Sequence, residues 1–174
     1  MKANSPTIFI RKALTDDIPL LVALSYEKRK AYEKAQPLFW RHAVDAEKSQ
    51  TQWFEALLLD PRYMMLVASQ DSTSEKDQAS IIGFVIGQKV KTPEVYDLGG
   101  YTCVVDDFCV RNDTLWSTVG GRLIAHLKKV AQENGCTQWV IVAGNHDNAK
   151  CGFLDETGLS IASRWYVGTL GEKS

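Results

Sequence analysis

Two adjacent carboxylates, Asp106 and Asp107, interrupt an otherwise apolar run over residues 103–110. Burying an unpaired carboxylate costs on the order of several kcal/mol, so each needs a partner, access to water or a raised pKa. Neighbours on a strand face opposite sides unless a bulge re-aims one of them. One alternative is that the strand ends here and both aspartates are solvated. Because residues 108–110 resume the apolar run, we favour a buried strand that carries acids for general acid–base chemistry.

A polar turn and the beginning of a helix follow this strand, over residues 111–122. The first amides of a helix lack internal partners, and the helix dipole favours anions there. Small residues, here Thr118, Gly120 and Gly121, let a phosphate approach such amides closely. A Gly-Gly pair also serves tight packing and is weak evidence alone. After an acid-bearing strand in a β-α-β unit, it indicates a phosphate-bearing cofactor beside a general base.

The strand, turn and helix together resemble the central motif of the GNAT N-acetyltransferases. In that family, Arg/Gln-x-x-Gly-x-Gly/Ala begins five residues after the strand and opens a helix whose amides hold the pyrophosphate of acetyl-CoA. Residues 106–110 are similar to the acid-Asp-Phe-Phe-Val strand of spermidine/spermine N-acetyltransferases. With no gap from Val110, the motif falls on Leu115, Trp116, Ser117, Thr118, Val119 and Gly120.

The resemblance implies a set of roles for residues of this chain. Asp106, directly or through a water molecule, is expected to be the general base, and Asp107 to hold the acceptor ammonium or share the acid role. Amides at Thr118 to Gly121 are expected to take the pyrophosphate. The pantetheine arm of the cofactor is expected to pair with the amides of Phe108, Cys109 and Val110. The family's asparagine before the last helix falls on Asp147, with Asn145 and Asn148 beside it as further cofactor contacts.

Three residues depart from the family pattern. Leu115 stands where Arg or Gln is usual, and Thr118 replaces the first glycine. Backbone amides do most of the phosphate binding, and the Thr118 hydroxyl is itself a donor. Leu154 occupies the position of a tyrosine that, in many relatives, is thought to protonate the departing thiolate. The thiolate must then take its proton from another residue, from water or from the attacking amine.

The first two helices of GNAT proteins and their connection usually roof the acceptor site. Here that connection contains Phe39 and Trp40, which we expect either to contact the acceptor or to pack the helices on the sheet. The charged stretch over residues 27–30 is predicted to be a solvated helix face.

The elements that must position these residues follow the order β-α-α-β-β-β-α-β-α-β. This predicts one α/β domain over residues 1–174, a GNAT-like mixed sheet flanked by helices on both faces. The unit over residues 101–143 should be parallel. The second helix should carry Ala46, Trp53, Phe54, Leu57 and Leu58 on one side. Strands are predicted over residues 7–11, 63–69, 80–90, 101–110, 136–143 and 159–168, helices over 15–35, 45–58, 119–134 and 148–157, and a polar loop over 70–79.

Composition narrows the class of protein. A net charge of −1 gives no field that would draw the chain to nucleic acid or an anionic membrane. No apolar stretch approaches the roughly 20 residues that span a bilayer, and no signal peptide is evident, so the cytoplasm is the expected location. The four cysteines and three histidines form no ligand pattern, which argues against a metal site.

The sequence therefore predicts an enzyme that transfers an acetyl group from acetyl-CoA to the amine of a small molecule or peptide, by direct attack in a ternary complex. The alternative is a GNAT-fold protein that binds acyl-CoA without turnover, which Leu115, Thr118 and Leu154 favour. A third is an α/β binding domain without coenzyme A. The sequence identifies neither the acceptor nor the oligomeric state, for which a homodimer stays open.

Overall fold

The computed structural model describes residues 7–70, 80–96 and 98–171. Five strands form one sheet in the order β1-β2-β3-β4-β5; all neighbouring pairs are antiparallel except β4 and β5, which are parallel as predicted. The strands are β1 (Ile8–Lys12), β2 (Tyr63–Gln70), β3 (Ser80–Lys91), β4 (Tyr101–Val110) and β5 (Cys136–Ile141). The helices are α1 (Ile18–Ala35), α2 (Pro37–Trp40), α3 (Ala46–Leu59), α4 (Gly121–Glu133) and α5 (Asn148–Glu156).

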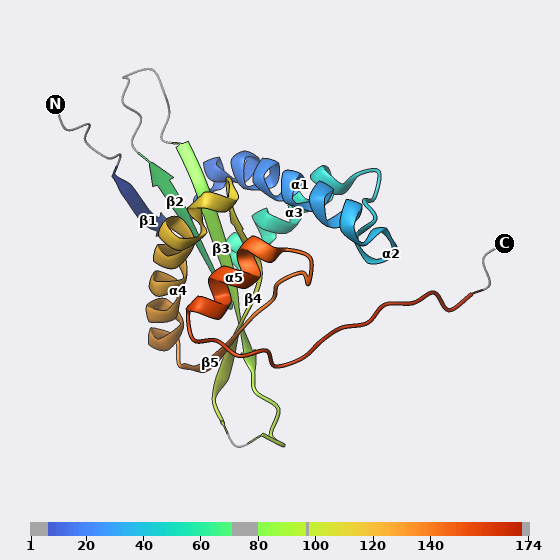
Figure 1. Ribbon diagram of the computed structural model, residues 1–174. Coiled ribbons are helices and arrows are strands. Elements are labelled where there is room, and N and C mark those ends of the chain that lie inside the picture. Colours follow the sequence, from blue (N-terminus) through green and yellow to red (C-terminus); the bar gives the residue numbers. More distant parts are fainter. Residues whose placement is uncertain (1–6, 71–79, 97, 172–174) are drawn as a thin grey trace.

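Helices cover both faces of the sheet, as the sequence predicts (Figure 1). On one face α4 and α5 enclose a core that includes Val105, Phe108 and Leu127. On the other, α1 and α3 enclose a second core around Phe54 and Phe84. The middle strands β2 and β3 are buried along most of their length because both of their faces are covered, which matches their near-continuous apolar sequences.

Local sequence signals account for the ends of the helices. Pro19 lies in the first turn of α1, where its missing amide costs nothing. The helix ends at Ala35 because Pro37 disfavours the helical conformation of the residue before it. Gln36 then starts the short helix α2, which was not predicted, by accepting from the amide of Leu38. Gly135, at φ +80°, ends α4, because glycine readily adopts the left-handed conformation that stops a helix.

Two expectations about the fold are wrong. Residues 159–168, predicted as a last strand, belong to no helix or strand and run away from the sheet (Figure 1). Their exposed side chains include Trp165 and Tyr166. Trp53 does not join the buried side of α3 with Phe54 and Leu57; half of it is exposed. The loop predicted over 70–79 lies outside the described residues, apart from Gln70 in β2. No helix of the described ranges is long and apolar enough to cross a membrane.

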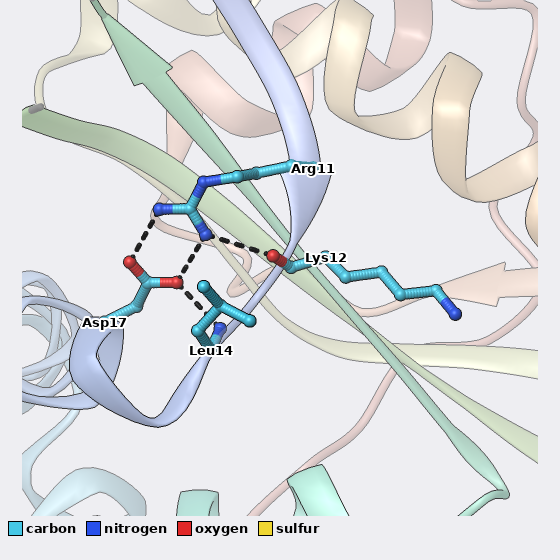
Figure 2. A network of polar contacts seen from close by, with 4 residues as sticks. All are labelled: Arg11, Lys12, Leu14 and Asp17. Carbon is cyan, nitrogen blue, oxygen red and sulfur yellow. Dashed lines mark hydrogen bonds and ion pairs between the residues drawn. The ribbon is translucent and has the colours of Figure 1, made fainter.

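An ion pair fixes the turn between β1 and α1 (Figure 2). The two terminal nitrogens of Arg11 donate to the two carboxylate oxygens of Asp17 at 2.6 and 2.8 Å, and the amide of Leu14 donates to the same carboxylate at 2.8 Å. Burial alone would raise the pKa of Asp17, but these hydrogen bonds and the charge of Arg11 outweigh it and hold the pKa below its usual value.

We expect Asp17→Ala to lower the free energy of unfolding by about 1–3 kcal/mol at neutral pH, because it leaves Arg11 and the Leu14 amide without their acceptor. A carboxyl group whose pKa is lowered by folding stabilises the fold above its unfolded pKa of about 3.9. The difference between wild type and variant should therefore shrink below about pH 4. Urea unfolding at pH 7 and pH 3 measures both; equal stabilities at pH 7 would contradict this role for Asp17.

Candidate functional site

A β-bulge in β4 arranges the two aspartates. Val85 pairs with Phe108 and Gly87 pairs with Val105, so Asp106 and Asp107 together oppose the single residue between them on β3. The side chains of Val105 and Phe108 both pack on the α4 side of the sheet. Asp107 is half-buried and Asp106 is exposed. The structure therefore contains the bulge considered in the sequence analysis. At this bulge Asp106 is open to water and Asp107 is partly shielded from it.

Asp107 lies in a charged environment beside α1. Burial raises the pKa of Asp107, and the nearby Asp106 raises it further. Lys28, Lys150 and Arg29 oppose this rise, because each cation favours the ionised carboxylate. A carboxyl group whose pKa is raised toward neutrality is a stronger base than an ordinary aspartate.

Next to the bulge, strands β4 and β5 part. Their pairing ends at Val105 and Ile141, with a last hydrogen bond from the amide of Val142 to the carbonyl of Val105 at 2.8 Å. Strand β4 continues to Val110 without β5 beside it. The amide of Arg111 donates to β3, so along the alternating strand the backbone groups of Phe108 and Val110 point the other way, toward the gap. By the same alternation, the amide of Cys109 points toward β3.

Two lysines meet at this gap. The Nζ atoms of Lys28, from α1, and Lys150, from α5, donate to the carbonyl oxygen of Phe108 at 3.2 and 3.3 Å. Lys150 also donates to the carbonyl oxygen of Val142 at 2.7 Å and is completely buried. The prediction of a solvated face over residues 27–30 is therefore wrong for Lys28 and for Arg29, which are half-buried.

A second polar group ties α1 to the beginning of α5. The hydroxyl of Tyr32 donates to one carboxylate oxygen of Asp147 at 2.8 Å, and the other carboxylate oxygen accepts from the amide of Lys150 at 3.2 Å. Asp147 therefore caps α5, and Tyr32 fixes its orientation. Burial first, and then the charge of Asp147, raise the pKa of the Tyr32 phenol, so this hydroxyl stays protonated.

The helix after β4 begins with an unusual turn. A 3₁₀ turn over Asp113–Leu115, capped by Asn112, leads into a π-turn over Trp116–Gly120 and then into α4. Hydrogen bonds in a π-turn reach back five residues, so amides at its beginning have no acceptor inside the turn. Ser117 and Thr118 are exposed there and present small side chains to solvent. Amides without an acceptor and small exposed side chains both favour the binding of an anion at this turn.

Other residues of the predicted cofactor motif face inward. Trp116 lies in the core between Phe108, at 4.8 Å between ring centroids, and Phe153, at 5.7 Å. A side-chain carbon on Gly120 would lie 2.9 Å from the Trp116 ring, so the glycine is needed for packing. Val119 is also buried, while Leu115 and Gly121 are half-buried. Only the backbones of the buried residues are thus left to contact a ligand.

The expected acceptor residues line a hollow formed by α1, α2 and α3. Phe39 and Trp40 form part of a cavity of about 370 Å³ that also contains Arg29, His42 and Trp53. The Phe39 and Trp40 rings meet edge to face at 4.7 Å, and Trp40 packs in the same way on Tyr32 at 5.1 Å. The exposed ring of Trp53 is explained by this position, since it forms a wall of the hollow rather than part of the core.

The remaining predicted residues lie near the beginning of α5. Asn145 and Asn148 are exposed, whereas Leu154 is buried in the α4-side core. Sequence reasoning missed Lys28, Tyr32 and Lys150. The signal for Lys150 was its spacing: it stands three and four residues before Phe153 and Leu154, on the buried face of a helix.

Comparisons with known proteins agree with this geometry. A model described as the acetyltransferase (GNAT) family matches residues 26–158. A predicted acetyltransferase from Clostridium acetobutylicum, solved with acetyl-CoA, has a TM-score of 0.68 at 19% identity, over 94% of this chain and 97% of its own. An aminoglycoside N-acetyltransferase in complex with CoA has a TM-score of 0.72 at 13% identity, over 97% and 98%.

A ribosomal-protein-alanine N-acetyltransferase from Brucella melitensis biovar Abortus is also similar, with a TM-score of 0.62 at 18% identity over 94% of this chain and 100% of its own. At these identities the likenesses show the fold and leave the substrate open. A search of curated proteins finds no match.

Proposed function

The chain belongs to the GNAT acetyltransferase family, and from this premise we propose that it transfers an acetyl group from acetyl-CoA to the amine of a small molecule or peptide. The acceptor attacks the thioester directly while both substrates are bound. The observation that carries the proposal is the parting of β4 and β5 beside Asp107, which leaves a backbone edge open next to a half-buried carboxylate.

The open edge suits the arm of the cofactor. The amides of Phe108 and Val110 face the gap, and an extended pantetheine arm can pair with them as a strand would, while the Phe108 carbonyl already accepts from Lys28 and Lys150. The pyrophosphate then lies at the π-turn, against the amides near Ser117 and Thr118. The exposed Asn145 and Asn148, just before and at the beginning of α5, remain proposed contacts for the rest of the arm.

We assign proton acceptance to Asp107 rather than to Asp106. Asp107 is the aspartate whose pKa is raised, by burial first, and the neighbouring cations keep its charged form accessible. The ammonium form of the acceptor first releases one proton to solvent, and the uncharged amine then gives up a second proton as it attacks, which Asp107 takes. Asp106, exposed to solvent, is placed to help bind the ammonium form of the acceptor before it reacts.

The acceptor binds in the hollow lined by Phe39 and Trp40. Arg29 lines this hollow and its charge interacts with that of Asp107, which supports an acceptor site near the proposed base. The lining holds Arg29, Arg41 and His42 but no carboxylate. This favours amines that carry a neutral or anionic group over polycations.

Phe39→Ala is expected to raise the KM for the acceptor about tenfold, the loss that corresponds to one aromatic contact of about 1.4 kcal/mol. Phe9→Ala is the matched control, because Phe9 is exposed to nearly the same extent, 48% against 50%, but lies in β1. The dissociation constant for acetyl-CoA should not change in either variant. Equal acceptor KM values for Phe39→Ala and wild type would place the acceptor elsewhere.

Thiol release with a panel of amines tests the proposed function. The panel should contain amino acids, peptides, polyamines and aminoglycosides, each with acetyl-CoA, and the acetylated product should be identified by mass. One class is expected to give CoA and product in equal amounts. A protein that binds acetyl-CoA but is inert toward every amine would instead be a non-catalytic acyl-CoA-binding protein of the same fold.

A further inference from the structure

Lys150 is the most deeply buried charged group among the described residues, with none of its surface exposed. Its side chain leaves α5 and ends between the two strands where they part. Removing an ammonium group from water is costly unless it is paired or strongly hydrogen-bonded. Its two side-chain acceptors, however, are the neutral carbonyl oxygens of Phe108 and Val142. The positive charge is therefore held in place without a carboxylate in contact with it.

The location of this charge coincides with the open edge of β4. Phe108 supplies both an acceptor of Lys150 and part of the edge at which the pantetheine arm is proposed to bind. The ammonium therefore lies within one hydrogen bond of that edge. A preorganised cation without a contact anion, in a site closed to water, stabilises negative charge that develops beside it.

The leaving group of the proposed reaction is the source of such a charge. Leu154, which replaces the tyrosine of many relatives, is buried among apolar side chains and has no proton to give. We infer that Lys150 is a catalytic residue of the transfer, and that its ammonium group stabilises and protonates the CoA thiolate as it leaves. This inference rests on the proposed function.

The protons and electrons of this step balance. The nitrogen of the uncharged acceptor amine forms a bond to the acetyl carbon and loses one proton to the carboxylate of Asp107. The carbon–sulfur bond breaks, its electron pair stays on sulfur, and the sulfur takes a proton from Lys150. Afterwards Asp107 releases its proton to solvent and Lys150 regains one, so that the net products are the amide and free CoA.

The acidity of Lys150 suits this role. Burial first, and then the charge of Lys28 on α1, lower the pKa of Lys150 to about 7, against the opposite effect of Asp147 before α5 and of Cys109 and Asp107 on β4. An aliphatic thiol has a pKa of about 8.5, so proton transfer from such a lysine to the thiolate is downhill. Because only the protonated lysine can act as an acid, turnover should fall as the pH rises through about 7.

The test compares Lys150→Met with Lys28→Met, which removes the other lysine donor to the Phe108 carbonyl. We expect Lys150→Met to lower kcat by about 10² and to keep the KM for acetyl-CoA within about threefold. Lys28→Met should lose less than about tenfold in kcat and keep the fall in rate, but at higher pH, because the charge of Lys28 lowers the pKa of Lys150. Lys150→Arg retains the charge but cannot lose its proton, so this fall should be absent.

A second readout does not need turnover. The thiol of bound CoA should titrate below about 8.5 in wild type, followed by the ultraviolet absorbance of the thiolate, and at or above that value in Lys150→Met. A bound thiol with an ordinary or raised pKa in wild type would overturn the inference, as would full kcat and an unchanged pH profile in a folded Lys150→Met. If wild type binds CoA but acetylates no amine, the proposed function fails, and this titration still decides whether Lys150 lies beside the sulfur.

Discussion

Asp107→Asn is expected to lower kcat at neutral pH by roughly 10²–10⁴, the usual loss when a general base is removed. A base works only when ionised, and the pKa of Asp107 is raised, so the wild-type rate should climb as the pH rises through that raised value. The variant should lack this climb. Steady-state rates from pH 5 to pH 9, with a saturating acceptor, measure both effects.

Stability separates this catalytic role from a structural one. When folding raises the pKa of a carboxyl group, its charged form destabilises the fold at any pH above that value. Asp107→Asn should therefore be at least as stable as wild type at pH 7, by urea unfolding. Asp106→Asn should cost less than about tenfold in kcat because Asp106 is exposed. If Asp106→Asn shows the larger loss, the assignment of the base is reversed.

Thr118→Glu is expected to weaken acetyl-CoA binding at least a hundredfold, or by about 2.7 kcal/mol. The substitution places a carboxylate where the pyrophosphate is proposed to lie, and like charges brought together at a binding site cost several kcal/mol. Thr118 is exposed, and an acid at the beginning of a helix favours the helix, so the fold should persist. Calorimetric titration with CoA measures the change.

Thr118→Gln is the matched control, since it has the size of the glutamate without its charge. Its affinity should fall by less than about tenfold. Equal losses in the two variants would mean that bulk rather than charge is responsible, and unchanged affinity in Thr118→Glu would exclude the π-turn as the pyrophosphate site. Gly120→Glu is less informative, because any side chain there would collide with Trp116.

Patterns that depend on neighbours in sequence were predicted well. The apolar run broken by Asp106 and Asp107 indicated β4, and its limits, Tyr101–Val110, are those of the structure. The helix predicted over residues 119–134 depends only on helical spacing and local conformation, and α4 (Gly121–Glu133) confirms it. Strands β4 and β5, which α4 connects, are parallel as predicted. A helix of this length carries the chain back to the end of the sheet at which β4 began.

Features that depend on distant contacts were missed. Residues 159–168 contain Ile161, Trp165 and Val167, which favour strands, but a strand also needs a neighbour with free backbone groups, and sequence alone does not supply one. Lys28 looked like part of a solvated charge run, yet its Nζ reaches a carbonyl 80 residues away in sequence. Lys150 was missed for the same reason, because it is buried only through its contacts with the carbonyls of Phe108 and Val142, where β4 and β5 part.

A crystal structure of the protein with CoA tests the central claim most directly, because every role proposed here depends on the cofactor lying in the gap between β4 and β5. The expected result has the pyrophosphate at the amides near Ser117 and Thr118, the pantetheine arm along Phe108 and Val110, and the sulfur within hydrogen-bonding distance of the Lys150 Nζ. CoA bound elsewhere, with the edge of β4 left open, would contradict the account.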